Sequence, residues 1–154
     1  MFYFRSALVA LVLSALAIAQ QKETSMTHHA HGTFTVKVQP LTPAPAEGIS
    51  RFSIDKEIHG DLEAMTKGEM FSAGDVKSGV AGYVAIEVVT GTLAGKHGSF
   101  ALQHSATIDQ SGPKMAVTVV PGSGTGDLKG ISGTFAIQIA NGQHSYDLEY
   151  KLPE

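Results

Sequence analysis

Several ionisable side chains stand where the alternation of a β-strand would turn them toward apolar neighbours. His104 shares a strand face with Phe100 and Leu102, and His144 is in phase with Tyr146. A buried imidazole requires hydrogen-bond partners. The spacing therefore predicts polar groups inside an apolar interior, where they either orient a small molecule or hold the strands in register.

A lysine and a glutamate extend this group. Lys56 lies on the apolar face of the segment 52–59. An unpaired ammonium group is costly there, so we expect a carboxylate partner such as Glu87 or Glu69. Glu87 is in phase with Tyr83 on a segment whose two faces are both mostly apolar, so the sequence leaves its side open.

Three functions fit these residues. The leading interpretation is a protein that binds a small apolar or amphipathic ligand in the interior and orients it by a few polar contacts. One alternative is a cofactor-independent cyclase or isomerase, with Glu87 or a histidine as general base and a neighbouring histidine or tyrosine as acid. The other is a structural or interaction module whose interior is filled by its own side chains. The candidate ligand-binding residues are Tyr83, Glu87, His104, His144, Tyr146 and Lys56.

Other chemistries lack the residues that they need. The chain has no cysteine, which excludes disulfides, thiolate metal sites and a thiol nucleophile. It contains neither a G-x-S-x-G elbow nor an H-E-x-x-H motif. Asp61 and Glu63 share a strand face, but beside the turn at Gly60 we interpret them as a solvated edge rather than a hydrolytic pair. We expect no cofactor and no metal site.

The first residues have the layout of a secretory signal peptide. Arg5 precedes an apolar run from Ala7 to Ala19, which ends in the small-residue cleavage site Ala17-Ile18-Ala19. The run is shorter than the roughly 20 residues of a membrane-spanning helix. We therefore assign residues 1–19 to a signal peptide and expect a periplasmic or secreted protein without a stable membrane anchor after cleavage. The alternative is that Met26 is the true start.

A polar segment follows the predicted cleavage site. Residues 20–31 lack hydrophobic periodicity, so we predict a flexible tail. Its histidines, His28, His29 and His31, have the composition of a transition-metal site. Exposed terminal segments are usually loose and solvated, however, and we assign these histidines no metal function.

From residue 32 onward, apolar and polar residues alternate with a period of two, and helical periodicity is absent. The alternation predicts eight strands at about 33–38, 52–59, 62–71, 83–89, 99–106, 115–120, 134–139 and 144–152. Many strands with short turns between them are typical of an antiparallel barrel or sandwich. We predict an all-β domain over residues 32–153, an eight-stranded antiparallel barrel, because closure removes unpaired strand edges.

An internal repeat marks one end of this barrel. Residues 90–103 and 125–138 align without gaps and share the frame T-G-x-L-x-G-x-x-G-x-F-A-[LI]-Q. Leu93 and Leu128 occupy equivalent places and are suited to plug the apolar end, while the glycines permit bulged or left-handed backbone. Neither copy contains the G-x-x-x-x-G-K-[ST] phosphate loop, so turn geometry is the favoured interpretation.

Size and charge limit the remaining possibilities. The chain has 154 residues, 43% of them hydrophobic, which suits one domain. Eleven basic and fourteen acidic side chains give a net charge of −3. No broad basic surface is available to neutralise a phosphate backbone, so we expect no nucleic-acid partner.

Short blocks in a fixed order carry a family likeness. GTGDLKGISG at 124–133 is similar to the loop signature of dirigent proteins. Further blocks are S-I-D-K from Ser53, H-G-D-L-E from His59, K-G-E-M from Lys67, G-Y-V-A-I-E from Gly82, L-Q-H-S from Leu102, V-T-V-V-P from Val117 and G-Q-H-S-Y from Gly142. This series, over about Gly32 to Pro153, resembles the bacterial domain-of-unknown-function family three-two-two-four. The resemblance implies the small calycin-type barrel of allene oxide cyclase and dirigent proteins, assembly as a homo-oligomer and no established activity, since sites rather than folds determine function.

Overall fold

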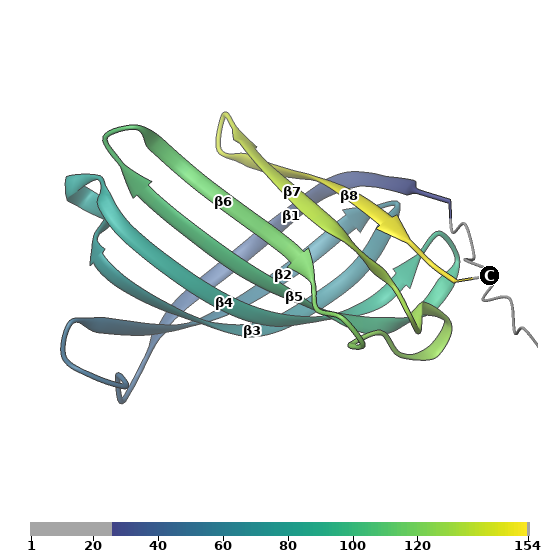
Figure 1. The fold of residues 1–154 in the computed structure, drawn as a ribbon, viewed down its shortest axis with the longest axis horizontal. Helices are drawn as coiled ribbons and strands as arrows, with labels where there is room; N and C mark the ends of the chain where they lie inside the picture. The colour runs from purple at the N-terminus through teal and green to yellow at the C-terminus, as the bar shows by residue number, and fades with distance from the viewer. Residues whose placement is uncertain (1–25, 154) are drawn as a thin grey trace, which may run out of the picture.

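The structure, a computed structural model, describes residues 26–153, which form an antiparallel β-barrel (Figure 1). Eight strands follow one another around the wall: β1 His28–Leu41, β2 Ile49–Gly60, β3 Leu62–Asp75, β4 Val80–Leu93, β5 Lys96–Asp109, β6 Gly112–Val119, β7 Ser132–Ala140 and β8 Gln143–Lys151. Two short 3-10 turns, Val76–Ser78 and Gly126–Leu128, lie in the connections. The predicted all-β, eight-stranded antiparallel barrel is confirmed, and each predicted strand overlaps an observed one.

Alternation of apolar and polar residues turns one face of each strand inward, as β5 illustrates. Phe100, Leu102 and His104 are buried, whereas Gln103 and Ser105 are exposed. The buried face of each strand contributes to one shared core, because successive side chains of a strand point to opposite faces of the sheet. Within residues 26–153, no helix has the length and hydropathy to cross a bilayer.

The first strand closes the barrel against the last one. β1 pairs with β8 from His28 opposite Tyr150 to Phe34 opposite His144, and each of the other ladders joins consecutive strands. The strands therefore form a closed antiparallel meander. Over residues 28–34 of β1, the backbone groups of the first and last strands are paired with each other.

The first strand begins earlier than the sequence indicates. Residues 28–31, which belong to the predicted tail 20–31, pair with β8, and Ala30 is buried in the core. The tail prediction is corrected for these residues, because the backbone of β8 supplies hydrogen-bond partners that local composition does not reveal. The predicted signal peptide, 1–19, and the remainder of the predicted tail, 20–25, lie outside the described residues.

One end of the barrel is filled by the repeated segments. Leu93, Leu128 and Ile131 are buried in the core, so both equivalent leucines of the repeat plug this end as predicted. The two copies of the repeat also contact each other, since the Ser99 N–H donates a hydrogen bond to Thr125 Oγ1 at 3.1 Å. The two copies of the repeat therefore pack together and fill this end of the barrel with buried side chains.

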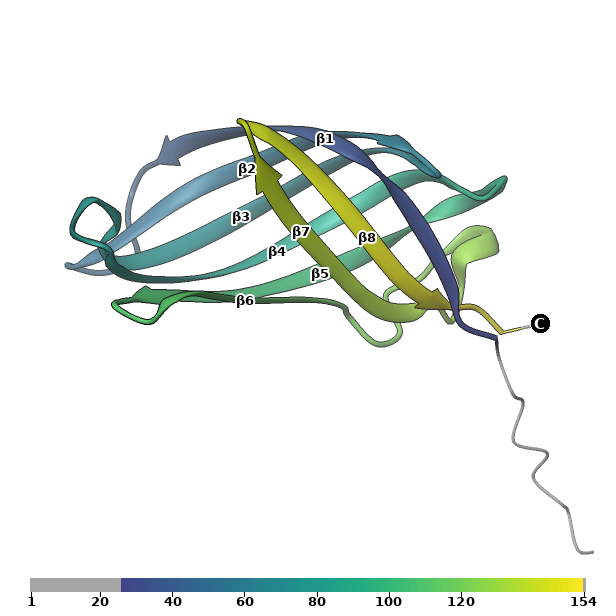
Figure 2. The same cartoon turned by 90° about the horizontal axis from the view of Figure 1, so that it is seen from above.

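The opposite end is joined less completely. Between β6 and β7 the ladder consists of one pair, Thr118 opposite Thr134, and the β7–β8 hairpin diverges from β6 toward its turn (Figure 2). A hollow of about 330 Å³ lies in this gap, with walls that include Met115, Val117, Phe135 and Ile137. A second hollow of about 460 Å³ lies where β1 and β8 part, with walls that include Phe34, Val36 and His144. We refer to this end as the open end.

Candidate functional site

Four polar side chains meet inside the barrel, one from each of β2, β3, β4 and β5. They are Lys56, Thr66, Glu87 and His104, which we call the buried ion cluster; all four are buried, and Glu87 is 0% exposed. His104 Nε2 lies 2.7 Å from Glu87 Oε1, to which Lys56 Nζ also donates. The Thr66 hydroxyl donates to Glu87 Oε2 at 2.7 Å. Both carboxylate oxygens are therefore occupied.

Strand register positions these groups. Lys56 stands opposite Thr66, and its backbone N–H donates to Thr66 Oγ1 at 3.1 Å. The same hydroxyl donates to Glu87, so one threonine links three strands. Lys56 Nζ also lies 5.2 Å from the centroid of the Phe34 ring, a cation–π distance. Among the described residues, no fully buried side-chain nitrogen or oxygen lacks a hydrogen-bond partner, so the cluster is internally satisfied.

The surroundings of Glu87 keep it ionised. Burial by itself raises the pKa of a carboxyl group. At Glu87 this effect is outweighed by the hydrogen bond with His104, the charge and hydrogen bond of Lys56 and the hydrogen bond from Thr66, which together lower its pKa to about 2. A carboxylate with so low a pKa is a weak base near neutral pH. This arrangement is better suited to holding strands together than to abstracting a proton.

The lysine partner expected from the sequence is present. Lys56 pairs with Glu87, which was one of the two predicted carboxylates. The sequence did not show which face of its strand Glu87 occupies, and the structure places it on the inward face. The other predicted carboxylate, Glu69, instead accepts two hydrogen bonds of 2.7 Å from the Arg51 guanidinium. Of the six candidate residues, Lys56, Glu87 and His104 come together in one site.

Tyr146 and His144 lie apart from that site. The Tyr146 hydroxyl accepts a hydrogen bond of 3.0 Å from the Leu62 N–H, and its ring stacks on Phe135 with centroids 5.0 Å apart. His144 packs against the Phe34 ring at 5.0 Å and borders the larger hollow of the open end. Tyr146 therefore belongs to the packed core, whereas His144 is accessible from one gap beside the β7–β8 hairpin.

Tyr83 also stands at the open end, in phase with Glu87 on β4. Its hydroxyl donates to the Met115 sulfur at 3.7 Å. Burial, followed by the charge of Glu87, raises the pKa of Tyr83. The phenol therefore remains protonated at neutral pH and can donate a hydrogen bond to another group.

Thr66 is the member of the cluster that sequence reasoning missed. It is in phase with buried Leu62 on β3, so strand alternation alone identifies it as an inward-facing polar residue. The signal was present, but a threonine in a strand is unremarkable because β-branched residues favour strands. Its role depends on the two partners that strand register brings to it.

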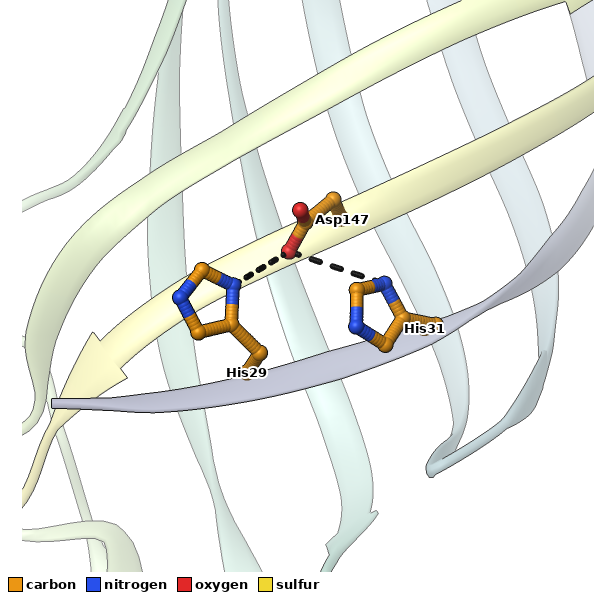
Figure 3. A group of neighbouring side chains, drawn as sticks. All are labelled: His29, His31 and Asp147. Carbon is orange, nitrogen blue, oxygen red and sulfur yellow. Dashed lines mark hydrogen bonds and ion pairs between the residues drawn. The ribbon is translucent and has the colours of Figure 1, made fainter.

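A separate group lies on the outer surface of the closing ladder. His29 and His31 project from β1 on either side of Asp147 of β8 (Figure 3). Their Nδ1 atoms lie 3.0 Å and 3.7 Å from Asp147 Oδ1. The sequence pointed to the histidines, but it did not show that Asp147 faces them across the ladder.

Gly68 is required by the packing around Glu87. It stands opposite Glu87, and a Cβ added at Gly68 would lie 2.4 Å from the Ile86 carbonyl oxygen and 2.5 Å from Glu87 Cβ. We expect Gly68→Ala to lower the free energy of unfolding by about 1–3 kcal/mol, because the two strands must move apart. Urea denaturation measures the change.

Gly82 provides the matched control on the neighbouring strand. A Cβ there would meet its nearest atoms at 3.4 Å and 3.5 Å, which is ordinary contact. We expect Gly82→Ala to alter stability by less than Gly68→Ala. Equal losses from the two variants would contradict the close approach assigned to Gly68.

Residues 30–150 match the family model described as "Protein of unknown function (DUF3224)". Among solved structures, the chain is similar to a protein of unknown function from the DUF3224 family of Shewanella oneidensis MR-1. The two are 41% identical with a TM-score of 0.75, and the similarity covers 84% of this chain and 100% of the other. No curated protein matches the chain. The chain therefore belongs to the DUF3224 family, which the ordered sequence blocks predict.

Proposed function

We propose that this barrel binds a small apolar or amphipathic molecule at its open end. The observation that carries the proposal is the exposure of apolar side chains on the inward face of the wall. Val38, Met115 and Ile139 are 47%, 44% and 63% exposed. A filled barrel would cover these groups, because apolar surface left in water is unfavourable.

The phase of these residues distinguishes them from ordinary surface side chains. Met115 is in phase with buried Val117 on β6, and Ile139 is in phase with buried Phe135 on β7. Met115 lines the hollow between the two strands, and Ile139 lies on the same inward face of β7, two residues beyond Ile137, which also lines it. The hollow between the strands, about 330 Å³, is at the lower end of the size range of small-molecule sites.

Polar contacts at this end would fix the orientation of a bound molecule. The Tyr83 hydroxyl is held only by the weak contact to the Met115 sulfur, and a thioether is a poor acceptor. A ligand carbonyl or hydroxyl oxygen is a better partner for it. The expected ligand therefore has an apolar body and one polar group, while the buried ion cluster supports the wall behind it.

Lysine substitutions on the two faces of the wall test the proposal. The probe is phenylnaphthylamine, a neutral fluorophore whose emission rises in apolar sites. We expect Met115→Lys and Ile139→Lys each to weaken its binding by about tenfold or more, because an ammonium group in the site must be desolvated. Fluorescence titration measures the affinity, and native mass spectrometry of the purified protein identifies any molecule that copurifies.

The outer face offers a matched control for each substitution. Met65 and Ile86 are 51% and 50% exposed, but their strand phase turns them outward. Met65→Lys and Ile86→Lys should leave probe affinity unchanged. If the outer variants weaken binding as much as the inner ones, or if the wild-type protein binds no probe, the open end is not a ligand site and the filled structural module is favoured.

Two further parts of the proposal concern the setting in which the protein works. Export to the periplasm or the medium rests on the signal peptide predicted at residues 1–19, and N-terminal sequencing of the mature protein tests it. Homo-oligomer formation stays a prediction, which light scattering on the purified protein tests. Both are independent of the ligand experiment.

A further inference from the structure

We propose that His29, His31 and Asp147 form a surface site for a divalent transition-metal ion of the Zn²⁺ type. The three side chains offer two imidazole nitrogens and one carboxylate oxygen, all within 4.8 Å of one another. Among residues 26–153, they form the one group of at least three such ligands that converges in this way.

The ligand separations are close to those that a metal requires. Zinc–nitrogen and zinc–oxygen bonds of about 2.0–2.1 Å place two ligands of a tetrahedral site about 3.3 Å apart. The two Nδ1–Oδ1 separations here, 3.0 Å and 3.7 Å, lie on either side of that value. Figure 3 shows the carboxylate between the two rings. All three ligand atoms lie within 4.8 Å of one another, so rotation of these side chains can bring them onto one ion.

The pairing of β1 with β8 holds the backbone of the three ligand residues in place without a metal ion. His31 stands opposite Asp147 and His29 opposite Glu149 in the β1–β8 ladder. The two histidines are two residues apart on one strand, so they share its outer face, and their rings are stacked at 6.0 Å with an interplanar angle of 12°. A preorganised set of ligands loses less conformational freedom on binding than a mobile tail does. The reason for assigning no metal to these histidines from the sequence therefore no longer applies.

The charge of the site favours a cation. Two carboxylates of β8 stand beside His29: Asp147, at 3.0 Å from its Nδ1, and Glu149, which is opposite it in the ladder. Their negative charge attracts a metal cation to the two imidazoles. Two imidazoles favour Zn²⁺ and its transition-metal neighbours over the hard ions Mg²⁺ and Ca²⁺. Three protein ligands leave a further coordination position for water or another ligand.

Calorimetric titration of the full protein without a polyhistidine tag tests the site. We expect one Zn²⁺ per chain, no displacement by excess Mg²⁺, and a rise in melting temperature on zinc addition because the ion joins β1 to β8. Each of His29→Gln, His31→Gln and Asp147→Asn should weaken zinc binding by about tenfold or more, and each should abolish the zinc-dependent rise in melting temperature. These side chains are exposed, so circular dichroism should show the fold retained.

His59 provides a matched control. It forms an exposed pair with Glu63, Nδ1 to Oε2 at 3.0 Å, that resembles the His29–Asp147 pair but has no second histidine in the group. His59→Gln should leave the zinc affinity and the zinc-dependent melting shift unchanged. Absence of zinc binding by the wild-type protein, or equal weakening by His31→Gln and His59→Gln, would overturn the proposal in favour of scattered binding to surface histidines.

Discussion

Replacing Lys56 with methionine is expected to lower the free energy of unfolding by about 3–5 kcal/mol, because it leaves a buried carboxylate without its cation. Glu87 is 0% exposed and would retain only the hydrogen bonds with His104 and Thr66. Methionine is close to lysine in length and suits the apolar neighbours, so the loss reports the charge rather than a cavity. Urea denaturation at neutral pH, followed by circular dichroism, measures it.

An exposed ion pair of the same barrel gives the comparison. Lys67 Nζ lies 3.0 Å from Asp55 Oδ2, with 76% and 33% of the two side chains exposed. Lys67→Met should change stability by no more than about 1 kcal/mol, because water screens and replaces such pairs. If Lys56→Met costs no more than Lys67→Met, the interior of the barrel is not the low-polarity environment that we describe.

The double variant Lys56→Met/Glu87→Gln separates charge from packing. Glutamine keeps the shape of Glu87 and can still hydrogen-bond with His104 and Thr66, but it carries no charge. We expect the double variant to recover most of the stability lost in Lys56→Met, since removing both charges of a buried pair costs far less than removing one.

Acid should destabilise the barrel through the same carboxylate. The pKa of Glu87 is about 2 in the folded protein against an ordinary value of 4.5, so its contribution is complete above about pH 4.5 and is lost as the pH falls toward 2. Each pH unit of that difference corresponds to about 1.4 kcal/mol, which amounts to about 3 kcal/mol in all. Urea denaturation at a series of pH values between 7 and about 2.5 measures the loss.

Other carboxylates also lose favourable partners in acid, and they set the background of this experiment. Glu63, Glu69 and Asp109 have lowered pKa values because of the hydrogen bonds that they accept. All three are accessible to water, so screening makes their effects small. The double variant Lys56→Met/Glu87→Gln retains these groups and lacks the Glu87 titration. An equal acid dependence in the double variant and the wild type would assign the loss to the surface carboxylates.

Much of the fold could be predicted from the sequence because each strand carries its own period-two pattern. The inward position of Lys56 and its need for a carboxylate also followed from local alternation and the cost of a buried charge. Glu69 is in phase with exposed Met65 on β3, so the wall separates it from Lys56. Glu87 could not be placed from the sequence, because both faces of its strand are mostly apolar and the barrel decides which of them is inward.

The errors arose where distant segments decide the structure. Residues 28–31 look like a polar tail because their alternating pattern is too short to recognise, yet β8 holds them in the wall. The separation of β6 from β7 could not be predicted from the sequence either, because apolar and polar residues alternate along both strands as they do in fully paired ones. The alternation of apolar and polar residues identifies the buried face of a strand, but it does not show along how much of its length the strand is hydrogen-bonded to a neighbouring strand.

The β1–β8 ladder has a consequence for the order in which the chain folds. Seven of the eight strand pairings join consecutive strands, whereas the closing one joins β1 to β8. The side-chain hydrogen bond between His29 and Asp147 on this ladder spans 118 positions of sequence. The entropy of loop closure is therefore concentrated in one ladder, and hairpins can accumulate one by one before it forms. We expect this ladder to form last, and a metal ion bound by side chains of both strands would then stabilise the closed barrel.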